Sequence, residues 1–109
     1  MSNLSDFVTA NKLLDMYGSL LTESQYHICD LYYRFNLSIS EIADEKNVSR
    51  AAVNDALKKS MKALHNYEEK LHNIDKKEMF ITKLKTIEKE ADSKKKNELI
   101  ENMIKEYLY

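Results

Sequence analysis

The sequence predicts an all-α protein, and three observations support this fold class. The 109 residues include no proline and a single glycine, so the chain lacks the residues that β-hairpins and tight turns between strands need. Helix-start patterns of the form Ser/Thr-x-x-Glu/Gln stand ahead of apolar residues at helical spacing. The stretch from Ser38 to Leu57 has the spacing of a helix-turn-helix, the two-helix unit that places its second helix in the DNA major groove.

The first helix is expected near residues 5–17, and a second helix is expected to follow it closely. Gly18 stands where a helix end commonly takes a left-handed residue. Thr22 and Gln25 form a capping box ahead of the second helix, which Asn36 closes. The two helices carry apolar side chains at helical spacing: Leu4, Phe7, Leu13, Leu14, Tyr17, Ile28, Cys29, Leu31, Tyr32 and Phe35.

The helix-turn-helix pattern begins with a second capping box. Ser38 and Glu41 open its first helix, whose inward face carries Ile39, Ile42 and Ala43. Asn47 occupies the turn, where a positive φ is needed and Asn is well tolerated. Ser49 is the expected N-cap of the second helix, and that helix turns Val53, Ala56 and Leu57 inward.

Beyond this motif the apolar pattern continues without a helix breaker as far as Ile74. A continuous helix over residues 50–74 would be roughly 37 Å long, more than a small domain needs for its own core. We therefore expect a helix-turn-helix domain in residues 1–74 and a C-terminal helical extension in residues 75–109. In the extension, Asp75 and Glu78 cap a helix, residues 92–97 form a solvated turn or a frayed helix end, and an amphipathic segment runs from Leu99 to Leu108.

Composition narrows the classes of function. The net charge is −1, and residues 34–67, with six basic and four acidic side chains, are the one net-positive segment. The lone Cys29 excludes an intramolecular disulfide and a four-cysteine zinc site. No apolar run is long enough for a membrane span, and the N-terminus lacks the pattern of a signal peptide. A cytoplasmic protein without membrane insertion is expected.

No catalytic, cofactor or metal-binding motif is recognised. A chain with one glycine has no glycine-rich phosphate loop. His65 and His72 are seven residues apart, whereas metal ligands on a helix favour a separation of three or four. We therefore expect a protein that is not an enzyme, with no metal and no cofactor.

The exposed face of the second motif helix is the candidate nucleic-acid site. Its predicted contact residues are Arg50, Ala51, Asn54, Lys58, Lys59 and Lys62. Asp55 on the same face would repel phosphate, so a purely structural three-helix unit with solvated charges is the alternative. Five tyrosines could form a base-stacking platform, but they are better explained as core and rim residues because they share helical spacing with Leu and Ile. They are Tyr17, Tyr26, Tyr32, Tyr33 and Tyr67.

The chain resembles region 4 of bacterial sigma factors and, more closely, the YlxM-like helix-turn-helix proteins of Gram-positive bacteria. The resemblance covers about residues 12–74. It is carried by Leu20-Leu21-Thr22, Gln25, Leu31-Tyr32-Tyr33, Glu41-Ile42-Ala43, Val48-Ser49-Arg50, Val53, Asp55, Lys58-Lys59, Leu64, Tyr67-Glu68 and Lys70-Leu71. Lys59 stands where that family more often has Arg, and Asn36 where it often has an acidic residue. The resemblance implies a small non-enzymatic protein whose gene neighbours encode signal recognition particle components, and hence a regulatory role in protein targeting.

Two hypotheses about function follow from these features. In the first, the protein is a regulatory module that binds DNA or the signal recognition particle RNA. In the second, it is an adaptor that binds the proteins of that particle without touching nucleic acid. In either case the surplus apolar surface predicts a homodimer, with an interface formed by Leu71, Ile81, Leu84, Leu99, Met103 and Tyr107.

Overall fold

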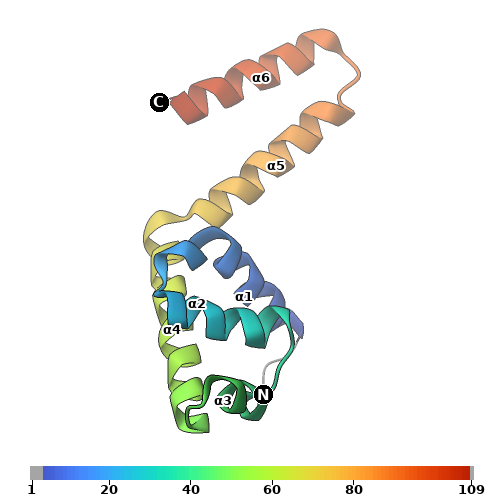
Figure 1. The fold of residues 1–109 in the computed structure, drawn as a ribbon. Helices are drawn as coiled ribbons and strands as arrows, with labels where there is room; N and C mark the ends of the chain where they lie inside the picture. Colours follow the sequence, from blue (N-terminus) through green and yellow to red (C-terminus); the bar gives the residue numbers. More distant parts are fainter. Residues whose placement is uncertain (1–3, 109) are drawn as a thin grey trace. The chain divides into compact units, whose positions relative to one another are not determined.

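The computed structural model describes the backbone of residues 4–108 and the side chains of residues 6–107. Within this range the chain is helical, without β-strands, as predicted (Figure 1). The elements are α1 (Leu4–Tyr17), η1 (Gly18–Leu20), α2 (Glu23–Cys29), η2 (Asp30–Arg34), α3 (Ile39–Lys46), α4 (Arg50–Leu71), α5 (Asn73–Lys89) and α6 (Ser93–Leu108). They form two compact units, the first ending at Ile74 and the second beginning at Asp75.

The first unit is built around α4. Helices α1, α2 and α3 all contact it, and Figure 1 shows α3 beside the start of α4. Because three helices approach α4, its apolar face is enclosed, and Val53 and Leu64 are fully buried. The core of this unit consists of Leu13, Leu14, Tyr17, Ile28, Cys29, Leu31, Ile42, Ala43, Val53, Leu57 and Leu64.

The helix caps of the first unit confirm the sequence predictions. Both Thr22 and Ser38 form complete capping boxes. Asn47 adopts φ 56°, the left-handed conformation expected at the turn of the motif. The Ser49 hydroxyl accepts a hydrogen bond from the Ala52 N–H at 3.0 Å and starts α4.

The second helix widens into a π-helical turn, η2, which the sequence pattern did not predict. The N–H of Phe35 donates to the carbonyl of Asp30, a bond between residues i and i+5, at 3.1 Å. Asn36, with φ 58°, ends the segment as expected. The turn places Tyr32 and Tyr33 edge to face with their ring centroids 4.8 Å apart. Such turns are often found at functional sites.

Gly18 corrects one prediction. It was expected to adopt a left-handed conformation, but its φ is not positive. Its importance is steric, because a Cβ at this buried position would lie 2.7 Å from Cε2 of Tyr26. The residue therefore allows the close approach of α2 to the end of α1.

A further correction concerns the long helix. The pattern predicted no break before Ile74, yet α4 ends at Leu71. His72 adopts φ 54° and separates α4 from α5, which begins at Asn73, two residues before the predicted cap Asp75. The residue in this left-handed conformation is a histidine and not a glycine or asparagine, the residues that usually mark a helix end. The break was therefore not predicted from the sequence.

Side chains from distant parts of the first unit stabilise that break. The Tyr17 hydroxyl donates to Oε1 of Glu68 at 2.5 Å, and the same oxygen accepts from the Ile74 N–H at 3.0 Å. The Tyr17 oxygen also accepts from the Asn73 N–H at 3.2 Å. Two of the first N–H groups of α5, which have no partner within a helix, are thus satisfied.

The second unit is a hairpin of α5 and α6. The segment 92–97, expected to be a turn or a frayed end, is instead mostly helical. Oδ1 of Asp92 accepts from the Lys94 N–H at 2.9 Å and so starts α6 at Ser93. The side chains of Leu4 and Leu108, included in the apolar patterns, lie outside the described side chains.

The thiol of Cys29 lies inside the first unit. Both Cys29 and Ser60 are fully buried, and Ser60 donates a hydrogen bond to the carbonyl of Ala56 at 2.7 Å. Burial raises the pKa of the Cys29 thiol, and a hydrogen bond with Ser60 lowers that pKa in part. The thiol is therefore protonated and enclosed, as expected for a structural cysteine.

Candidate nucleic-acid interface

The candidate site is the exposed side of α4. Ser49 starts the helix directly after the α3–α4 turn, and the buried residues Val53, Leu57, Ser60 and Leu64 hold its other side against the core. The predicted contact residues are all solvent-exposed on α4: Arg50, Ala51, Asn54, Lys58, Lys59 and Lys62. The structure therefore leaves one side of the first four turns of α4 open to a ligand.

Four of these residues form a row along the helix. Arg50, Asn54, Lys58 and Lys62 are each four residues apart, so they follow one another on adjacent turns. The row is about 18 Å long. Among the described residues, none of its three cations forms an ion pair. Their charges remain available for phosphate groups.

Lys59 differs from the other lysines of this surface. Its Nζ lies 3.1 Å from Oδ2 of Asp55, one turn earlier on the same helix. The side chains of both residues are largely exposed, so the pair adds little stability. The pair matters for the charge of this surface: the negative charge of Asp55 offsets the positive charge of Lys59.

A hollow lies beside the row. It has a volume of about 470 Å³, and Asn54 and Lys58 stand at its edge together with Tyr32 and Tyr33 from η2. Burial, followed by the neighbouring Cys29, Tyr32 and Asp6, raises the pKa of Tyr33 to about 12. The Tyr33 phenol therefore stays protonated at neutral pH.

The prediction that five tyrosines belong to the core and its rim is confirmed for Tyr17, Tyr26, Tyr32, Tyr33 and Tyr67. Tyr17 is buried, and the ring of Tyr67 lies 5.9 Å from it, centroid to centroid. The rings of Tyr32 and Tyr33 pack against Phe7 at 5.6 and 5.3 Å. These contacts occupy ring surfaces that base stacking would need.

The hydroxyl of Tyr26 accepts a hydrogen bond from Arg34 at 2.7 Å, and Arg34 also contacts Asp15 of α1 at 2.6 Å. Arg34 is therefore engaged in joining η2 to α1 and is not part of the α4 surface.

Two features of this surface were not predicted from the sequence: the regular spacing of the row and the hollow beside it. The row of residues at intervals of four could have been found from the spacing alone. The hollow could not, because it depends on the π-helical turn that carries Tyr32 and Tyr33. Val48 in the α3–α4 turn is also exposed and adds apolar surface next to Arg50.

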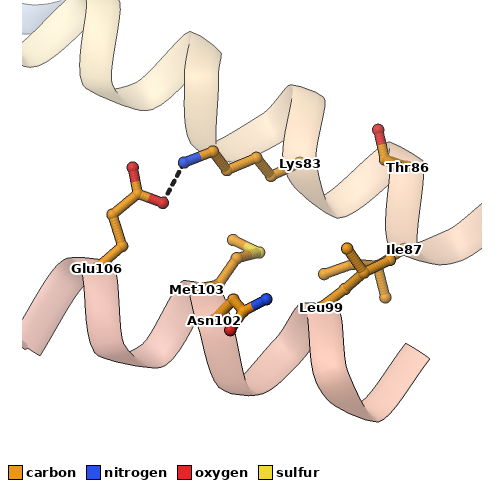
Figure 2. Close-up of a pocket in the computed structure, with 7 residues that line it drawn as sticks. All are labelled: Lys83, Thr86, Ile87, Leu99, Asn102, Met103 and Glu106. Carbon is orange, nitrogen blue, oxygen red and sulfur yellow. Dashed lines mark hydrogen bonds and ion pairs between the residues drawn. The ribbon is translucent and has the colours of Figure 1, made fainter. Parts of the chain in front are cut away.

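The residues predicted for a dimer interface differ in their exposure to solvent. Leu71 is exposed at the end of α4, and Ile81, Leu84 and Tyr107 are exposed in the second unit. Met103 is buried, and Leu99 is half-buried and lines a hollow with residues of α5 (Figure 2).

No helix in the described part of the chain is long and apolar enough to cross a membrane.

Comparison with known proteins agrees with this geometry. The model of the UPF0122 family, described as "Putative helix-turn-helix protein, YlxM / p13 like", matches residues 4–106. The chain belongs to this family. The match includes the helix-turn-helix and most of the second unit, so the expected family membership is confirmed well beyond residues 12–74.

Individual UPF0122 proteins are similar over much of the chain. A UPF0122 protein of Clostridium perfringens strain 13 is 43% identical over 98 residues, which are 88% of this chain and 83% of that protein. One from Clostridium kluyveri is 41% identical over 98 residues, 88% of each chain. One from Desulforamulus reducens is 49% identical over 73 residues, 67% of this chain and 62% of its own length.

Proposed function

We propose that this UPF0122 protein is a non-enzymatic regulatory protein that binds nucleic acid through the exposed side of α4. The observation that carries the proposal is the row Arg50–Asn54–Lys58–Lys62 on the second helix of a helix-turn-helix. In such units the first turns of this helix contact base edges while neighbouring cations contact phosphate groups.

Each member of the row has a role that its chemistry suits. The Arg50 guanidinium forms two parallel hydrogen bonds with guanine or with a phosphate group. The Asn54 amide pairs with adenine, and Lys58 and Lys62 neutralise phosphates. With three cations in the row, the logarithm of the binding constant should fall with the logarithm of salt concentration with a slope of roughly −3 per copy.

The nucleic acid is DNA or the signal recognition particle RNA. The latter enters because the resemblance to YlxM-like proteins implies a role in the protein-targeting pathway, in the cytoplasm. As a homodimer, the protein would present two α4 helices to two sites, as helix-turn-helix dimers do. The alternative is an adaptor that binds signal recognition particle proteins, which the pairing of Asp55 with Lys59 favours because it reduces the positive charge of α4.

Binding of labelled duplex DNA and of signal recognition particle RNA, each at two salt concentrations, tests the proposal. We expect Lys58→Glu to weaken binding by about 10-fold, because it replaces an attraction to phosphate with a repulsion. Lys70→Glu is the matched control, since it makes the same charge change on α4 outside the row. Asp55→Asn should strengthen binding about 2- to 5-fold by releasing Lys59.

Two results would contradict the binding of nucleic acid through the row Arg50–Asn54–Lys58–Lys62. One is negligible affinity for both probes at low salt. The other is an equal loss of affinity in Lys58→Glu and Lys70→Glu, which would show that only total charge matters. A pull-down with the particle's GTPase and its receptor then tests the adaptor alternative, which requires enrichment of at least one of them.

A further inference from the structure

The two sides of the α5–α6 hairpin differ in chemistry. One side has a polar rim: Lys83 and Glu106 form an ion pair across it, and Thr86 and Asn102 stand at its edge (Figure 2). Beneath this rim lie the apolar residues Ile87, Leu99 and Met103. The hollow on this side has a volume of about 180 Å³. Lys83 also lies 5.8 Å from the centre of the Tyr107 ring. The charged and polar rim of this side is suited to contact with water.

The other side of the hairpin is an apolar groove of about 420 Å³. Every residue that lines it is apolar, with Met103 between the two helices. Its walls are Phe80, Leu84 and Ile87 from α5 and Ile100, Ile104 and Tyr107 from α6. Of these six, all but the half-buried Ile87 are between 40 and 51% exposed.

The hairpin does not bury enough apolar surface to hold its helices together. Helix α5 has no buried residue, and in the described part of α6 only Met103 is buried. Units of fewer than about 40 residues usually need a disulfide, a metal or association with another chain. In proteins most of the stability of a helix comes from packing of its apolar face against other elements. The groove must therefore be covered for α5 and α6 to be stable.

We propose that a second copy of this chain covers the groove, so that two hairpins form a four-helix bundle. Two observations favour a second copy over a partner of different chemistry. The lining has no charged residue that would select an opposite charge. The 35 residues from Asp75 carry nine basic and eight acidic side chains, so two copies repel each other little.

The geometry of the bundle follows from symmetry. A two-fold axis places the same surface of each copy in the interface, so the groove of one hairpin faces the groove of the other. Phe80, Leu84, Ile100 and Ile104 become the centre of the interface, whereas the Lys83–Glu106 side stays in water. Apolar cores of this kind are typical of homodimers and of four-helix bundles.

The dimer deepens the proposed function, because it would present two α4 helices to the nucleic acid. This consequence of the dimer rests on the proposed nucleic-acid binding. The dimer itself does not require a ligand. Its test therefore uses the full chain without nucleic acid, and the two proposals can fail separately.

Sedimentation equilibrium of the full chain up to about 100 µM measures the association. We expect a dimer, and we expect Leu84→Glu to weaken it by about 100-fold or more, because two carboxylates would enter an apolar interface. Thr86→Glu is the matched control: it adds the same charge two residues away on the polar side and should change the constant by less than about 3-fold.

Ile104→Gln is a second, milder variant that keeps the proposal testable if Leu84→Glu loses helix content in circular dichroism. It should weaken the dimer by about 10-fold. A wild-type monomer at the highest concentration would overturn the proposal. The proposal would also be overturned if Ile104→Gln changed the association constant no more than Thr86→Glu does. The same holds for Leu84→Glu, provided that this variant keeps its helix content.

Discussion

The two units have similar helices but very different interiors. Helices α4 and α5 both carry apolar residues every three or four positions. In α4 these residues are enclosed, whereas α5 buries none of them. The difference lies in the number of neighbours: α1, α2 and α3 all contact α4, whereas α6 alone lies beside α5 within the second unit. Apolar periodicity therefore predicts a helix, but the surrounding helices decide whether its apolar face is buried.

Two leucines, Leu64 of α4 and Leu84 of α5, allow this comparison to be tested directly. Leu64 is fully buried and Leu84 is 46% exposed. We expect Leu64→Ala to lower the free energy of unfolding of the first unit by about 3 kcal/mol, because it leaves a cavity in an enclosed core. Urea denaturation monitored by circular dichroism measures the change.

Leu84→Ala is the control for this prediction. In dilute solution it should lower the free energy of unfolding by less than about 1 kcal/mol, because the side chain is already about half exposed to water. Equal losses in the two variants would show that the second unit is as closely packed as the first.

Gly18→Ala tests a close approach that exists only in the first unit. The new Cβ would lie 2.7 Å from the Tyr26 ring, which must move for α2 to stay in place. We expect a loss of about 1–2 kcal/mol in the free energy of unfolding. Ser19→Ala at the neighbouring exposed position should change it by less than about 0.5 kcal/mol. An unchanged stability in Gly18→Ala would mean that the Tyr26 ring moves aside without cost.

The capping box of α3 predicts a small effect of pH on the first unit. The carboxylate of Glu41 accepts a hydrogen bond from the Ser38 N–H at 3.0 Å, and this bond lowers the pKa of Glu41 below its usual 4.5. Because the folded pKa is lowered, the stabilisation is present above the usual pKa and is lost as pH falls through the folded value.

Glu41→Gln removes the titrating group but keeps an oxygen that accepts the bond. The stability of the wild type should therefore fall more than that of Glu41→Gln between neutral pH and about pH 3. Urea denaturation at the two pH values measures it. Parallel losses in the two proteins would exclude a contribution of Glu41.

Local features of the first unit were predictable because their partners lie within a few residues. Thr22 and Ser38 bond to groups three residues away, and Asn47 meets the turn conformation by itself. The exposed side of α4 was predictable for the same reason, because Val53 and Leu57 fix its inward face.

Features that depend on distant residues were not predictable. The role of Gly18 depends on Tyr26 in the next helix, and the break at His72 depends on Tyr17, which is 51 residues from its partner Glu68. The hollow beside Asn54 depends on the π-helical turn. In the first two cases the deciding contact is between helices, which periodicity along one helix does not describe. In the third it is a local widening of one helix, which the apolar spacing does not reveal.

The buried thiol makes the protein its own reporter of local opening. Cys29 is the one cysteine of the chain, and it lies fully enclosed in the first unit. A thiol reagent reaches it only when that unit opens, so its labelling rate measures the opening equilibrium of one unit while the other contributes no signal. The stabilities of the two units can thus be separated in the intact chain without an introduced label site.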